Sequence, residues 1–145
     1  MTPSSSNSPI QNAERQRLLL ACDVFADPLR DTFERVARLA RHALETPMAA
    51  LGILDGRRVQ YGATVGTNAT SCPVGPSVCR ALIDAGAPTA FHNSSVAQQF
   101  QQHPMMSREA PLQFVAGTPL VVDGPSHLIS SPTAVGALFV ADSAP

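Results

Sequence analysis

The strongest constraint on the fold lies near the end of the chain, where two apolar segments of strand length flank a turn-rich connection. The first runs from 114 to 122 and the second from 133 to 141, and the residues between them are rich in glycine, proline and serine. This pattern is typical of two antiparallel strands that are neighbours in a sheet. The chain is therefore expected to form a sheet that ends in a hairpin.

The earlier part of the chain alternates helix and strand signals. Residues 11–25 predict a helix with Leu18, Cys22 and Phe25 on one face, and residues 27–45 predict a second helix with Asp27 as its N-cap. Further strands are predicted at 48–54, 59–65 and 88–91, short helices at 76–86 and 94–101, and loops at 66–76 and 103–111. Hairpins at both ends of the strand series predict an α+β fold, with a central antiparallel sheet of about five to six strands flanked by helices.

The composition suits one folded domain. With 44% hydrophobic and 14% charged residues, the 145-residue chain can bury a core over residues 11–145, and residues 1–10 predict a disordered tail. The formal net charge of −1 includes no basic excess, so neither nucleic acid nor an anionic membrane is an expected partner. The first residues lack the features of a signal peptide, and no apolar run approaches the ~20 residues of a membrane span. The expected location is the cytoplasm.

Few side chains are suited to catalysis or metal binding. All ten cationic residues are arginine, which excludes Schiff-base chemistry on lysine. The cysteines, Cys22, Cys72 and Cys79, lack the paired spacing of a disulfide framework or a zinc knuckle. The four histidines are not spaced as a ligand cluster, so no metal is expected.

Several segments, taken in order, resemble the GAF domains of bacterial signalling proteins. Residues 112–120 read Leu-Gln-Phe-Val-Ala-Gly-Thr-Pro-Leu, which is similar to the Leu-Arg-Phe-Tyr-Ala-Gly-x-Pro-Leu of one large subgroup. Residues 136–142 resemble the closing Gly-x-Leu-x-x-x-Asp of that subgroup, Asp55-Gly56 resembles the turn of its first hairpin, and Cys79 stands where it has a cysteine. The resemblance covers residues 29–142 and implies a GAF/PAS-like domain that binds or senses a small molecule.

The resemblance also implies a set of residues at the ligand cavity: Tyr61, Cys79, His92, Asn93, Arg108, Gln113 and Phe114. Asn93 stands where aspartate is usual, Gln113 replaces an arginine and Val115 a tyrosine, which implies a less polar or altered cavity, or none in use. Arg108 could hold a carboxylate or phosphate in two places, or it could be a solvated loop charge.

Cys79 has two interpretations. Its position near a helix N-terminus would favour a reactive thiolate, whereas its apolar neighbours favour a small core residue. Cys72, seven residues earlier in a predicted loop, could act as a second thiol, as in the free methionine-R-sulfoxide reductases of the GAF group. A bilin chromophore is not expected, because Arg80 follows Cys79 where bilin-binding relatives have histidine.

The leading hypothesis is therefore a non-enzymatic sensory domain that binds a small organic ligand. Its terminal helices would form a homodimer, with the helix at 11–25 either at that interface or folded back on its own sheet. Through them it would act on an output domain such as a histidine kinase or a cyclic-di-GMP synthase. The alternatives are a thiol-redox enzyme and a dimerisation module without ligand.

Overall fold

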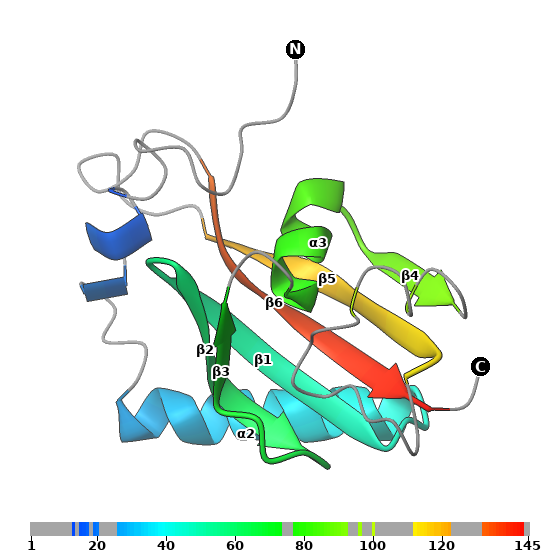
Figure 1. The fold of residues 1–145 in the computed structure, drawn as a ribbon. Helices are drawn as coiled ribbons and strands as arrows, with labels where there is room; N and C mark the ends of the chain where they lie inside the picture. Colours follow the sequence, from blue (N-terminus) through cyan, green and yellow to red (C-terminus); the bar gives the residue numbers. More distant parts are fainter. Residues whose placement is uncertain are drawn as a thin grey trace.

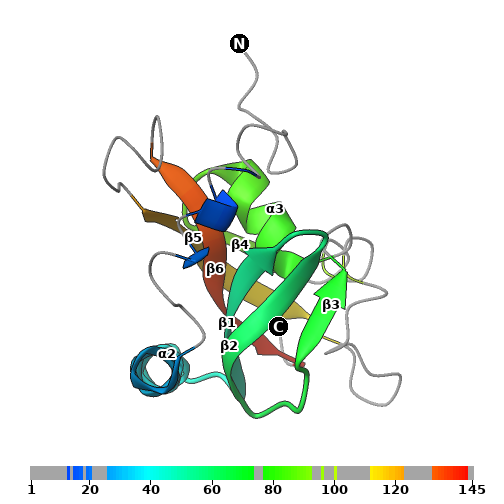
Figure 2. The ribbon, with the colours of Figure 1, turned by 90° about the vertical axis from the view of Figure 1, so that its left-hand side faces the viewer.

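The computed structural model describes residues 13, 15–17, 19–20, 26–73, 77–92, 96, 100, 112–122 and 132–143. One six-stranded sheet forms the centre of this part, with helix α2 (Asp27–Ala43) on one face and helix α3 (Val78–Ala85) on the other (Figures 1 and 2). We refer to these two sides as the α2 face and the α3 face. The predicted α+β architecture is confirmed.

Every strand pairs antiparallel with its neighbours, in the order β3-β2-β1-β6-β5-β4. The strands are β1 (Met48–Asp55), β2 (Arg58–Val65), β3 (Ser71–Pro73), β4 (Thr89–His92), β5 (Phe114–Val122) and β6 (Thr133–Asp142). The first and last strand pairs predicted from the sequence are both present, and the chain turns between β1 and β2 at Gly56, whose φ of 66° suits glycine. Strands β1 and β6 lie at the centre, which is why most of their residues are buried.

The sequence did not predict β3. Residues 66–76 were expected to be a loop, but Ser71–Pro73 pairs with Arg58–Gln60 as an edge strand. A proline is tolerated there because an edge strand does not need every backbone N–H in the ladder. Cys72 is consequently held in the sheet, with 2% of its surface exposed, and does not lie in a loop.

The two helices begin and end for different local reasons. Helix α2 begins at Asp27, so the capping position falls on Ala26 and the predicted Asp27 N-cap is wrong; Pro28 lies in its first turn. Helix α3 is capped by Ser77, whose hydroxyl accepts a hydrogen bond from the Arg80 backbone N–H at 3.0 Å. It ends at Gly86 in the left-handed conformation, as the sequence predicts.

The described residues between 13 and 20 are helical and pack against the chain's own sheet. Leu19 is buried among Leu51, Ile53 and Val135, and the Arg15 Nε donates a hydrogen bond to the Ala134 carbonyl at 2.8 Å. Burial lowers the pKa of Arg15. These contacts favour the interpretation in which this segment folds back on its own sheet. Leu18, Cys22 and Phe25, the predicted face, lie outside the described residues, and a dimer through this segment stays a prediction.

Within the part of the chain that the structure describes, no helix is both long enough and apolar enough to cross a membrane.

Candidate functional site

The predicted ligand residues fall on opposite faces of the sheet. Tyr61 and Cys79 belong to the core of the α3 face. His92 and Phe114 lie together on the α2 face, with their ring centroids 5.2 Å apart. The structure therefore brings these residues together in two pairs.

The remaining predicted residues add little to either pair. Gln113 is half-buried just before β5, and its backbone N–H donates a hydrogen bond to the Asp142 carbonyl at 2.9 Å. Asn93 and Arg108 lie outside the described residues. A role of any of these residues in ligand binding stays a prediction.

The pair on the α3 face belongs to a small polar cluster of one half-buried side chain, Tyr61, and two buried ones, Cys72 and Cys79, which we call the Tyr61 cluster. The Tyr61 hydroxyl and the Cys72 sulfur are 3.5 Å apart, and the Tyr61 ring meets Phe139 edge-on at 6.3 Å. The Cys79 sulfur lies only 2.6 Å from where a Cβ on Gly52 would be. Glycine at 52 is what admits the thiol between α3 and the sheet.

Burial sets the protonation of this cluster. Desolvation raises the pKa of Cys79 and of Tyr61, and also that of Cys72, although the Tyr61 hydrogen bond opposes the rise for Cys72. The two sulfurs are close enough that a negative charge on Cys72 would disfavour one on Cys79. Both thiols are therefore neutral at pH 7, which is the opposite of the activation that a helix N-terminus would give Cys79. The geometry supports the interpretation of Cys79 as a core residue.

We expect the protein to lose stability as the pH rises above about 9. The ordinary pKa of a cysteine thiol is 9.0, so the unfolded chain releases this proton while buried Cys79 keeps it. The unfolded state then binds fewer protons, and the free energy of unfolding falls by about 1.4 kcal/mol per pH unit for this thiol. Urea unfolding between pH 7 and 11 should show a shallower fall for Cys79→Ala than for the wild type. Equal slopes would mean that Cys79 is not buried as a neutral thiol.

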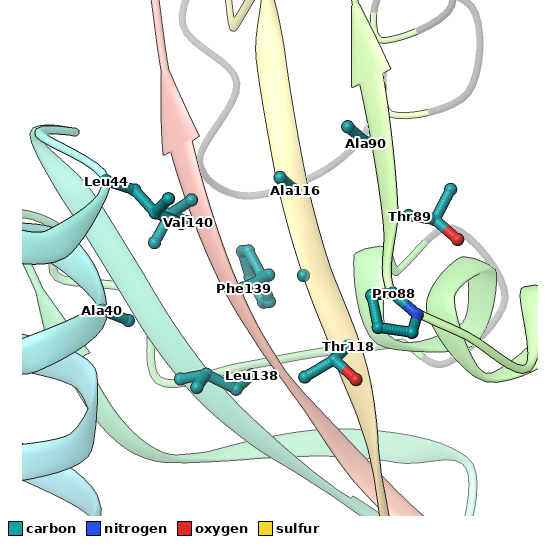
Figure 3. A pocket seen from close by; sticks show the side chains of 11 residues that line it. Ala40, Leu44, Pro88, Thr89, Ala90, Ala116, Thr118, Leu138, Phe139 and Val140 are labelled. Atoms are coloured by element: carbon teal, nitrogen blue, oxygen red, sulfur yellow. The ribbon is translucent and has the colours of Figure 1, made fainter.

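The α2 face contains an open apolar groove of about 530 Å³, which we call the α2 groove (Figure 3). Ala40 of α2 and Leu44, just after the end of that helix, form one side of the groove. Residues 88–90, including the start of β4, form the other side, and β6 and β5 are the floor between them. The β5 part of the floor consists of small residues, Ala116, Gly117 and Thr118, whereas the β6 part includes the larger Leu138 and Val140. Sequence reasoning missed this groove, because its sides come from segments more than 40 residues apart.

The fold defined by these elements is that of a GAF domain. The GAF domain of an Acinetobacter phosphoenolpyruvate-protein phosphotransferase superposes with a TM-score of 0.61 at 15% identity, over 95% of this chain and 80% of that one. A free methionine-R-sulfoxide reductase from Neisseria meningitidis superposes with 0.56 at 15%, over 99% and 79%. NreA of Staphylococcus aureus, with its nitrate-binding site mutated, superposes with 0.57 at 14%, over 79% and 87%. The GAF fold suggested by the sequence is confirmed.

No family model matches the sequence. Among curated proteins, a cyclic di-GMP phosphodiesterase of Pseudomonas aeruginosa is 24% identical over 112 residues, or 77% of this chain. The chain spans 19% of the length of that relative, so the similarity concerns one part of a longer protein.

Proposed function

We propose that this chain is a sensory or regulatory domain that binds a small organic molecule on the α3 face and requires no metal or bilin. The GAF fold carries this proposal. Solved proteins of that fold include one described by its nitrate-binding site and one crystallised with its substrate. The binding step would favour one arrangement of a dimer over another, and the difference in affinity for the two arrangements is the signal.

The chemistry of the α3 face supports the choice of that side. Ligand sites are mostly apolar with a few polar groups that fix orientation. The Tyr61 cluster supplies such groups, a phenol and two thiols, among apolar residues such as Val59, Leu82 and Phe139. Tyr61 is also only half-buried, so its ring is accessible to a ligand in a way that Cys79 is not.

The similarity to a cyclic di-GMP phosphodiesterase supports a proposal for the output. We propose that the domain regulates an enzyme of cyclic di-GMP metabolism or a comparable signalling output in the cytoplasm, either within one chain or as a separate subunit. The region similar to this chain makes up 19% of the relative, so most of that protein lies outside it. This is the organisation expected of a sensor domain joined to an output domain.

A thiol-redox enzyme is the second candidate, because solved reductases of free methionine-R-sulfoxide share this fold and both Cys72 and Cys79 lie beside Tyr61. Such an enzyme needs a thiolate to attack sulfur. Burial raises the pKa of both thiols, which opposes this chemistry. We therefore propose a binding role for the cluster and no catalytic one.

Native mass spectrometry of the purified protein, before and after denaturation, tests the proposal. We expect a small mass that is lost on denaturation. The bound fraction should fall in Tyr61→Phe, which removes only the hydroxyl on the α3 face, and should be unchanged in His92→Ala, which alters the opposite face. If the wild-type protein carries no bound mass, even after incubation with a crude cell extract, this result would count against a sensor of a small molecule.

A further inference from the structure

The α2 groove has the size and the chemistry of a site for a small apolar molecule. Its volume of about 530 Å³ lies within the roughly 300–1,000 Å³ of ligand sites in proteins. None of the described residues that line it is ionisable. Thr89 donates a hydrogen bond to the Ala87 carbonyl at 2.9 Å, and Thr118 also donates one within the chain. A charged group in the groove would therefore lose water without gaining a partner.

The register of the strands arranges the floor of the groove in rows. Ala90 of β4 pairs with Ala116 of β5, and Ala116 pairs with Val140 of β6, so these three form one row (Figure 3). Leu138, two residues before Val140, lies in the next row on the same face. Leu138 also packs against the apolar cluster that contains Leu19. One end of the groove is therefore apolar.

The row at the opposite end carries polar groups. His92 pairs with Phe114, and Phe114 pairs with Asp142. Each of them lies two residues from a member of the row that contains Ala116, so all three lie on the α2 face. The exposed His92 imidazole has its ring centroid 5.2 Å from that of Phe114, whereas Asp142 is two strand spacings, or about 10 Å, from His92. This end thus offers an imidazole that can form a hydrogen bond.

We infer that the α2 groove is a second binding site, whose ligand is an uncharged molecule with an alkyl or aromatic body and one hydroxyl or carbonyl group at its end. The body lies on the apolar rows between Leu44 and Ala90, and the polar end forms a hydrogen bond with the His92 imidazole. A carboxylate at that end would face Asp142. The inference does not depend on the proposed function, because the Tyr61 cluster lies on the other face of the sheet.

A nuclear magnetic resonance titration of the isotope-labelled full chain tests the inference, with octanol as the probe. We expect saturable chemical-shift changes of the backbone amides at 89–90, 92, 116–118 and 138–140, and none at Tyr61. Octanoate and octylammonium have the same alkyl chain but carry a negative and a positive charge. Each should bind at least about 10-fold more weakly than octanol, because the lining gives a charge no partner.

Two exposed positions allow the groove to be altered without changing the core. Ala90→Phe adds a ring to one side of the groove and should raise the octanol dissociation constant at least about 10-fold. Leu44→Ala removes apolar surface from the other side and should raise it about 3- to 10-fold. Leu39→Ala is the matched control, because Leu39 is 66% exposed and is not among the described lining residues. This control and Tyr61→Phe should bind octanol as the wild type does.

His92→Phe tests the polar end, because it keeps an aromatic ring beside Phe114 and removes the nitrogens. It should raise the octanol dissociation constant about 5-fold, which is the usual effect of one lost hydrogen bond. The inference is overturned if octanol causes no saturable shift up to its solubility limit, as would happen if a second copy covered the groove. Tighter binding of a charged probe, or unchanged affinity in Ala90→Phe, also overturns it. None of these results concerns a ligand of the Tyr61 cluster, whose binding is measured by the mass lost on denaturation.

Discussion

Replacing Gly136 with valine is expected to destabilise the protein by about 3 kcal/mol or more, which is a large part of the 5–15 kcal/mol that holds a typical domain folded. A Cβ at Gly136 would overlap the carbonyl oxygen of Gly52 and lie 3.1 Å from the Cα of Ile53. These are backbone atoms of β1, the central strand paired with β6. They cannot rotate away as a side chain can, so the strands must separate.

Thermal and urea unfolding followed by circular dichroism will measure the effect, which should lower the Tm by about 10 °C or more. Gly86→Ala is the matched control. Its φ of 72° costs about 1–2 kcal/mol for a residue with a Cβ, but no atom lies within 4 Å of the added Cβ. Stability should fall in the order wild type, Gly86→Ala, Gly136→Val, and Gly136→Ala can replace the valine variant if it does not fold. Equal effects at Gly86 and Gly136 would contradict the close approach of β1 and β6.

Gly136 also illustrates how far the sequence predicts this fold. The apolar runs that became β1, β2, β5 and β6 are long enough for their period to identify strands, and the turn at Gly56 identifies a hairpin. The sequence cannot say that Gly136 must be glycine because of Gly52, since that contact depends on how two strands far apart in sequence pair. Strand β3 was missed for the same reason: three residues ending in Pro73 carry no strand signal without β2 beside them.

The candidate site was harder to predict than the fold. Alternation along a strand places neighbours on opposite faces, and Phe91 contacts Phe100 in the α3 face while His92 contacts Phe114 in the α2 face. Alternation in the sequence separates His92 from Phe91, but it cannot place either on the side of Tyr61, because that depends on where β2 and β4 lie in the sheet. The raised pKa of Cys79 could not be predicted, because it is caused mainly by the complete burial of the thiol, where α3 packs the sulfur in a close fit against Gly52.

That fit leads to the second large effect. Gly52→Ala is expected to cost about 2 kcal/mol, because the added Cβ would lie 2.6 Å from the Cys79 sulfur and 2.7 Å from the Val59 Cγ1, both buried. Cys79→Ala alone should cost about 1–2 kcal/mol through lost packing. In the double variant the methyl group added at position 52 enters space left by the sulfur. The combined cost should therefore be smaller than the sum of the two by about 1 kcal/mol, with Val59 keeping the relief partial.

The double variant Gly52→Ala with Cys72→Ala is the control for this double-mutant cycle. The Cys72 side chain is not among the nearest neighbours of a Cβ at Gly52, so the two losses of stability should add. Urea unfolding at pH 7 measures all variants. Strict additivity for Gly52 and Cys79 would contradict the packing of the thiol against β1. The double variant also separates the two interpretations of Cys79, because it removes the sulfur while restoring part of the packing. A sensor that holds its ligand through the Tyr61 hydroxyl and the remaining Cys72 thiol should still bind it, more weakly, in this variant, whereas a redox enzyme that uses the Cys79 thiol should lose all turnover.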